Sequence, residues 1–98
     1  MQVVISQAAW SDLRRIGLAI AEDNRSRAES FIEELYDRCR ELRDMAYAFP
    51  LLGRSDSGIR RRVYGRYLIF YRIEEDTVQI VHILHGAMDY EAILFPKD

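Results

Sequence analysis

The chain has 98 residues, of which 49% are hydrophobic and 31% charged, a composition typical of a soluble globular domain rather than of a disordered or membrane-embedded chain. No stretch approaches the ~18 consecutive apolar residues of a membrane-spanning helix, and no basic region followed by an apolar run opens the chain, so we expect one cytoplasmic domain over residues 1–98 without a secretory signal. The net charge is only −2, but residues 54–73 carry six arginines against one acid, about +5 in total, which leaves about −7 for the rest of the chain.

The first half of the chain predicts a short strand followed by a helical hairpin. Residues 2–5 form an apolar run typical of a strand, and Ser6 can accept the free backbone N–H groups of a helix over about residues 7–22. Asn24 is a similar cap for a second helix over about residues 25–44. Both helices carry an apolar stripe with a 3.6-residue period, and so few residues separate them that we expect them to run antiparallel.

Three residues of this hairpin are expected to serve packing. Gly17 would let the second helix approach closely, and Trp10 is interpreted as a core or helix-packing residue rather than as a binding platform. Cys39 falls on the apolar stripe of the second helix. As the single cysteine, it predicts a buried, inert thiol and no internal disulfide.

A loop over about residues 45–58 leads to the predicted sheet. Three strands are predicted, over residues 59–64, 67–73 and 77–84. Gly65-Arg66 joins the first two, and glycine in the first central position indicates a two-residue type II′ turn. The last strand is apolar on both faces, which predicts a central position, and residues 88–95 predict a short C-terminal helix. The expected fold is α+β in the order β-α-α-β-β-β, with the helical hairpin on one face of a mostly antiparallel sheet.

Apolar side chains are expected on both faces of this sheet. In the middle strand, one face holds Tyr67, Ile69, Tyr71 and Ile73, and the other holds Leu68 and Phe70. In the last strand, Ile80 and Leu84 are expected opposite Val81 and Ile83. Because two helices cover only one face, we expect a partner on the second face; the alternative is cover by the C-terminal tail and the loop around Pro50.

The arginines of the basic segment can be interpreted in two ways. They favour an acidic partner for the sheet, either a nucleic acid or an acidic protein segment. The competing interpretation is an edge strand that its charge keeps soluble. Composition alone leaves both interpretations open.

The second half of the chain also carries a recognisable succession of residues. It runs from Arg61 to Ile73 (RRVYGRYLIFYRI) and continues with Val78 to Ile83, Leu84-His85-Gly86 and Asp89. Upstream, Asp12-Leu13, Ile16, the Asp23-Asn24 break and the loop from Pro50 to Gly53-Arg54 belong to the same pattern. In order and spacing this pattern closely resembles the ParE branch of the RelE/ParE toxin superfamily, and the resemblance covers nearly the whole chain. The sequence departs from that family where Ala87-Met88 replaces positions that frequently hold arginine.

The resemblance implies the toxin of a type II toxin–antitoxin module of the kind associated with plasmid stabilisation. It implies a ParD-like antitoxin that holds the toxin inactive, and DNA gyrase as a target that the toxin inhibits by binding, without catalysis, a cofactor or direct sequence-specific binding of nucleic acid. We expect the antitoxin or the target to bind the second, basic face of the sheet. The expected binding residues are Arg60, Arg62, Arg66, Phe70, His85 and Tyr90.

The strongest enzymatic alternative is a RelE-like, ribosome-dependent endonuclease that cleaves messenger RNA. Such cleavage needs a base for the 2′-hydroxyl and a cation for the phosphate, and His85, Arg66 and Tyr64 are the candidates. The isoelectric point near 5.7 argues against it, since ribosome binding favours a basic protein, and His85 before a glycine is equally typical of a turn anchor. A third alternative is a degenerate, non-toxic member that only binds its antitoxin.

A metal site is not expected. His82 and His85 are three residues apart on one strand, so they point to opposite faces, and no cysteine or carboxylate cluster accompanies them. His82 is expected to be packed and hydrogen-bonded.

Overall fold

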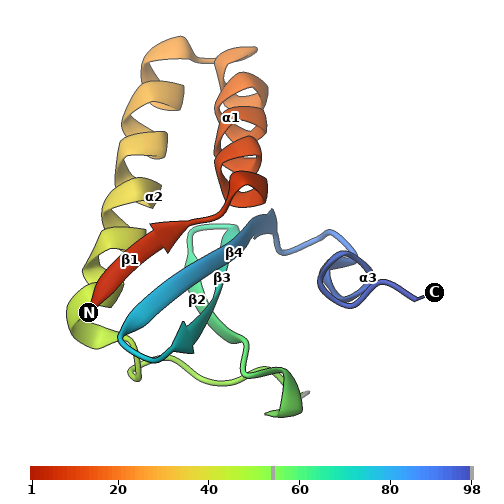
Figure 1. Cartoon of the computed structure of the whole chain (residues 1–98). Coiled ribbons are helices and arrows are strands. Elements are labelled where there is room, and N and C mark those ends of the chain that lie inside the picture. Colours follow the sequence, from red (N-terminus) through yellow and green to blue (C-terminus); the bar gives the residue numbers. More distant parts are fainter. Residues whose placement is uncertain (54, 98) are drawn as a thin grey trace.

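A short strand, a helical hairpin and a three-stranded meander follow one another along the chain (Figure 1). The elements are β1 (Gln2–Ile5), α1 (Gln7–Ala21), α2 (Arg25–Met45), β2 (Arg60–Tyr64), β3 (Tyr67–Glu74), β4 (Thr77–His85) and α3 (Tyr90–Leu94), with a 3-10 turn at Ser55–Ser57. This order confirms the predicted α+β fold. The computed structural model describes residues 1–53 and 55–97, so Arg54, one of the six arginines of the basic segment, lies outside the described residues.

The two long helices begin where their caps predict. The side chain of Ser6 accepts a hydrogen bond from the Ala9 backbone N–H, and that of Asn24 accepts one from Arg27, both at 3.0 Å. A Cβ atom added to Gly17 would lie 3.2 Å from the Ile32 side chain, so glycine permits the close approach of α2. The helices run antiparallel, and the end of the hairpin near their connection extends beyond the sheet (Figure 1). Within the described residues, neither helix is long and apolar enough to cross a membrane.

The sheet has the strand order β1-β4-β3-β2. Strand β1 runs parallel to β4, and the other neighbours are antiparallel, so β4 occupies the predicted central position. In the β2–β3 turn, Gly65 has a φ of +59°, whereas Arg66 keeps a negative φ. A positive φ at the first central residue alone is the requirement of a type II′ turn, which confirms the predicted hairpin.

Helix α1 completes the edge of β4 where β1 ends. Beyond Ile5, the Ser6 hydroxyl donates to the Val81 carbonyl at 2.9 Å. Asp12 then accepts the Ile83 backbone N–H at 2.9 Å and lies 2.7 Å from His82 Nδ1. Asp12 is only 2% exposed, so this carboxylate replaces a missing strand with side-chain hydrogen bonds. The expectation that His82 is packed and hydrogen-bonded is confirmed.

A β-bulge in β4 corrects one expectation about the sheet faces. Tyr71 pairs with Ile80 and Phe70 pairs with His82, which leaves Val81 without a partner across the strand. Beyond Val81 the alternation is shifted by one residue, so Ile83 joins Ile80 beneath the helices. Leu84 therefore points to the other face, and the predicted grouping of Ile80 with Leu84 is wrong.

The first of two hydrophobic cores lies between the helical hairpin and the sheet. Its fully buried members include Leu35, Ile69 and Tyr71, and the Tyr71 hydroxyl donates to the Ala46 carbonyl at 2.7 Å. Cys39 also lies there, 0% exposed, and burial raises the pKa of its thiol to about 12. The prediction of a buried thiol is thus confirmed, and a raised pKa disfavours the reactive thiolate.

A second core occupies the opposite face of the sheet. Four residues form it, with exposures of 0–7%: Ile59, Leu68, Phe70 and Leu84. Leu52 from the loop and Tyr90, Leu94 and Phe95 from the tail pack against them. In the isolated chain, this face is therefore covered by the tail and the Pro50 loop, which is the alternative to the expected partner. Burial of these side chains is favourable by ~25 cal/mol per Å² of apolar surface, and α3 and the Pro50 loop provide it.

Candidate functional site

The arginine strand β2 is an edge strand whose side chains alternate between the two cores. Arg60 pairs with Tyr71 and Arg62 with Ile69, both members of the first core, so these arginines point to the helical side. Arg61 pairs with Phe70 and points to the second core. The expectation that Arg60 and Arg62 share a face with Phe70 is therefore wrong.

Arg60 and Arg62 fasten β2 to the end of α2 and to the loop behind it. Arg60 donates to the Phe49 carbonyl at 2.7 Å. Arg62 donates to the Arg38 carbonyl at 2.9 Å and forms an ion pair with Glu41 at 3.0 Å, and only 13% of its side chain is exposed. Both guanidinium groups are thus engaged within the chain, and we interpret both arginines as structural clamps.

Arg61 is the arginine that lies beside Phe70. Its guanidinium donates to the Tyr90 hydroxyl at 3.3 Å, and the Tyr90 ring packs against Phe70 at a tilt of 38°, with centroids 5.1 Å apart. Arg61 was missing from the expected binding residues although the sequence held the signal. A two-residue turn at Gly65-Arg66 pairs Tyr64 with Tyr67, and counting back along both strands pairs Arg61 with Phe70.

The end of the sheet at the β2–β3 turn, which we call the turn end, brings together the three nuclease candidates Tyr64, Arg66 and His85. Tyr64 and Tyr67 flank the turn that holds the exposed Arg66, and His85 pairs with Tyr67. The His85 and Tyr67 rings meet edge to face with centroids 5.2 Å apart, and the Arg66 carbonyl accepts the Gly86 N–H at 2.8 Å. An aromatic and basic surface therefore surrounds this turn.

His85 is held as a turn anchor. Its Nδ1 accepts the Ala87 backbone N–H at 3.0 Å. A ring nitrogen that accepts a hydrogen bond carries no proton, so in the neutral ring the proton is on Nε2 and the basic lone pair is already engaged. This geometry disfavours His85 as a general base.

Tyr64 is held as a hydrogen-bond donor. Its hydroxyl donates to Glu34 at 2.5 Å, and Glu34 accepts two hydrogen bonds from the Arg27 guanidinium. The hydrogen bonds from Arg27 are the largest cause that lowers the pKa of Glu34, and the hydrogen bond from Tyr64 lowers it further. In turn, the hydrogen bond to Glu34 raises the pKa of the Tyr64 phenol. The phenol thus stays protonated, which is unsuitable for a base. Within the part of the chain that the structure describes, no three His, Cys, Asp or Glu side chains gather as metal ligands.

The outer edge of β2 is only partly covered. The Arg61 N–H donates outwards to the Pro50 carbonyl at 3.0 Å, and the Leu52 N–H donates to the Ile59 carbonyl at 2.9 Å. Val63, two residues further, presents its backbone on the same side, and beyond Arg61 no strand among residues 1–53 and 55–97 pairs with this edge. Val63 is 59% exposed. We define this free edge at Val63, with Arg61 and Arg66 on either side, as the candidate binding edge.

Two solved structures share the fold of this chain. The chromosomal ParDE system of P. aeruginosa superimposes with a TM-score of 0.73 at 16% identity, over 87% of this chain and 95% of that chain. The RelBE2 toxin–antitoxin complex of Mycobacterium tuberculosis superimposes with a TM-score of 0.56 at 24% identity, over 86% of this chain and 95% of that chain. At these identities, the likeness shows a shared fold.

The family follows from the sequence itself. Residues 3–90 match the family described as the ParE toxin of the type II toxin–antitoxin system parDE. The chain therefore belongs to this family of type II toxin–antitoxin toxins. No match was found among curated protein sequences.

Proposed function

We propose that this toxin acts by binding and inhibiting DNA gyrase and that a cognate ParD-like antitoxin neutralises it. The observation that carries the proposal is the state of the turn end. The candidate base His85 is engaged at Nδ1 by the Ala87 N–H, and the hydroxyl of the helper residue Tyr64 is engaged by Glu34. The turn end therefore offers a cation and aromatic surface for binding but no free base for cleaving RNA. Membership of the ParE family supports the same conclusion.

The purified toxin is expected to inhibit supercoiling by gyrase, and added antitoxin is expected to restore it. Ribosome-bound messenger RNA should remain intact. In the same assays, His85→Ala tests the nuclease alternative, because loss of a general base typically lowers cleavage by ~100-fold or more. Normal supercoiling at toxin excess, together with cleavage of messenger RNA on ribosomes, would favour the nuclease. Normal growth on expression without antitoxin would indicate a degenerate member.

For neutralisation, we propose that an acidic, extended antitoxin segment pairs with the candidate binding edge. An unpaired edge strand is a template for a further strand, and backbone hydrogen bonds there give affinity without a deep pocket. Arg61 and Arg66 flank Val63 and supply positive charge, and His85 and Tyr90 lie on the neighbouring surface. In this proposal Arg60, Arg62 and Phe70 support the edge from within.

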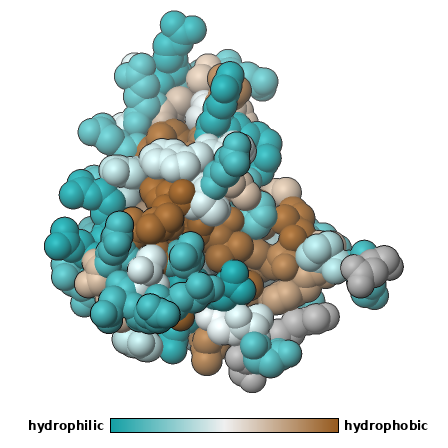
Figure 2. Space-filling model, in the orientation of Figure 1, coloured by the Kyte–Doolittle hydropathy of each residue, from teal (hydrophilic) through white to brown (hydrophobic). Residues whose placement is uncertain are grey.

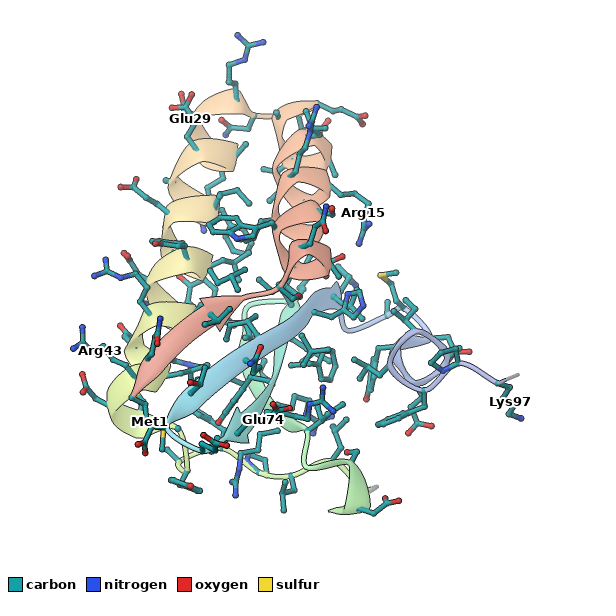
Figure 3. The ribbon with its side chains drawn as sticks, viewed as in Figure 1. Met1, Arg15, Glu29, Arg43, Glu74 and Lys97 are labelled. Carbon is teal, nitrogen blue, oxygen red and sulfur yellow. The ribbon has the colours of Figure 1, made fainter. Side chains whose placement is uncertain are left out.

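The paired substitution Arg61→Glu and Arg66→Glu is expected to weaken antitoxin binding by about 10–100-fold, since reversed rim charges mainly slow association. Val63→Pro removes an outward N–H while an edge strand can tolerate proline, and it should weaken binding more than Val63→Ala. Titration calorimetry at two salt concentrations measures both effects. Arg43→Glu is the matched control, since Arg43 projects from the far end of α2 (Figure 3). Unchanged affinity in the charge-reversed variant and in Val63→Pro would place the antitoxin elsewhere.

A further inference from the structure

One side of α2 faces the β2–β3 turn. Four residues form this turn-facing stripe, and their spacing of four, three and four places them on one side of a helix: Arg27, Phe31, Glu34 and Arg38. The Phe31 ring packs against the turn, with its centroid 5.7 Å from that of Tyr64 and 5.5 Å from that of Tyr67. A Cβ atom added to Gly65 would lie 3.8 Å from the same ring. The turn therefore rests on this stripe.

Glu34 is the centre of the polar contacts in the turn-facing stripe. Its carboxylate accepts hydrogen bonds from the Arg27 guanidinium at 2.8 and 3.3 Å and from the Tyr64 hydroxyl at 2.5 Å. Two cations lie over the rings beside it, Arg27 at 5.1 Å from the Phe31 centroid and Arg38 at 4.8 Å from the Tyr64 centroid. Glu34 thus fastens the last residue of β2 to the side of a long helix.

The turn lies at the end of an edge strand. Beyond Arg61, no strand in residues 1–53 and 55–97 pairs with the outer edge of β2. On the other side of the turn, the Arg66 carbonyl accepts the Gly86 N–H at 2.8 Å. The Arg66 side chain is exposed and forms no ion pair or hydrogen bond with any described residue. The direction of this free cation therefore depends on where Tyr64 holds the turn.

The contacts of Glu34 contribute little to the stability of the fold. The Arg27 side chain is 48% exposed and that of Glu34 32%, and ion pairs at such exposure are weak. The rest of β2 is fastened independently, because Arg62 binds the Arg38 carbonyl and Glu41. Loss of the Glu34 carboxylate should therefore displace the turn without unfolding the domain.

The turn-facing stripe is distinct from the apolar groove between α1 and α2. Figure 2 shows the apolar atoms of this groove at the surface between the two helices. From α2, the apolar residues Ala28, Ile32 and Tyr36 line it, and no residue of the turn-facing stripe does. A substitution at Glu34 therefore tests the turn end and not the groove.

We propose that Glu34 is a positioning residue for the target contact: through Tyr64, it sets the turn so that Arg66 meets an acidic segment of the target. A guanidinium without internal partners is suited to a carboxylate, and a contact held in one geometry loses less freedom on binding. Glu34 acts from behind, since both of its carboxylate oxygens already accept hydrogen bonds within the chain. This inference rests on the proposed inhibition of gyrase and adds the residue that orients the contact.

Inhibition of supercoiling by the purified full chain tests this role, measured as the toxin concentration that halves gyrase activity. Arg66→Ala and Glu34→Ala are each expected to raise this concentration by about tenfold, the usual effect of one charge-assisted contact. The double variant should lose no more than Arg66→Ala alone, because Glu34 acts through Arg66. Tyr64→Phe keeps the ring but removes the hydroxyl, and it should match Glu34→Ala.

Two variants and one local measurement complete the test. Glu34→Gln keeps an oxygen that can accept the Tyr64 hydroxyl and should retain most of the inhibition. Asp37→Ala removes an exposed carboxylate three residues further along α2 and should leave inhibition unchanged. Without gyrase, the Gly86 amide should exchange its hydrogen faster in Glu34→Ala than in the wild type, because the Arg66 carbonyl moves away. Circular dichroism checks that each variant is folded.

The outcomes separate this inference from the proposed function. Full inhibition by Glu34→Ala, or additive losses in the double variant, would overturn the positioning role while inhibition by the wild type still stood. A loss in Glu34→Ala that Tyr64→Phe does not share would make Glu34 a direct contact, which also contradicts the inference. A wild type that leaves supercoiling normal at toxin excess would remove the target and the inference with it. Faster exchange at Gly86 would then report a link that serves the fold alone.

Discussion

Replacing Phe70 with alanine is expected to lower the free energy of unfolding by about 3–5 kcal/mol, as is usual for a buried phenylalanine. Phe70 is 0% exposed at the centre of the second core, and its ring contacts Tyr90 on α3. Truncation would leave a cavity between the sheet and the short helix that covers it. Urea denaturation followed by circular dichroism measures the change.

Two controls separate core packing from other effects of Phe70→Ala. Phe70→Leu keeps most of the apolar volume and should cost less than Phe70→Ala. Val63 lies on the same face of the sheet as Phe70, but it is 59% exposed. Val63→Ala should therefore change the free energy of unfolding by less than ~0.5 kcal/mol. A loss below ~1 kcal/mol in Phe70→Ala would mean that α3 and the loop do not cover this face in solution. Weaker antitoxin binding by Phe70→Ala therefore indicates a direct contact only in a variant shown to be folded.

Asp12→Ala is expected to destabilise the domain by about 2–4 kcal/mol, the cost of leaving buried polar groups without a partner. The carboxylate accepts the Ile83 N–H at 2.9 Å, contacts His82 Nδ1 at 2.7 Å and pairs with Arg15 at 2.6 Å. Its removal leaves the edge of β4 unpaired at the point where β1 has ended. Urea denaturation measures the loss, and faster hydrogen exchange at the Ile83 amide would locate it.

Asp12→Asn and Arg15→Ala are the matched controls for this prediction. Asparagine keeps an acceptor for the Ile83 N–H and should cost less than alanine. The Arg15 side chain is 60% exposed and points outwards from α1 (Figure 3), so Arg15→Ala should cost no more than ~1 kcal/mol. Equal losses in Asp12→Asn and Asp12→Ala would assign the stabilisation to the negative charge rather than to the backbone hydrogen bond.

The elements that local interactions determine could be predicted from the sequence. Ser6 and Asn24 cap the long helices where the sequence predicts, and Gly65 sets the type II′ turn. A cap or a tight turn depends on residues three or four apart, so its signal survives in a short stretch of sequence. The central position of β4 could also be predicted, because a strand with apolar residues on both sides must be covered twice.

The β2 side of the candidate site was predicted less well, for an identifiable reason. The arginine strand was correctly located, but its side chains were assigned to one shared face with Phe70. The pairing of Arg61 with Phe70 follows from the turn and could have been counted. The capture of Arg60 by the Phe49 carbonyl and of Arg62 by Glu41 could not, because both partners lie in α2 or its loop and reach β2 only after folding.

By itself, the sequence determined the order of the elements, the hairpin geometry and the family, because these depend on local patterns and on residue order. Only the tertiary structure decided which surfaces remain open. The Val81 bulge moved Ile83 to the helical core, since a strand's register is set by its neighbours. The tail and the Pro50 loop covered Phe70, because packing these segments against the sheet removes their apolar surface from water. The open surfaces are therefore the edge at Val63 and the groove between α1 and α2.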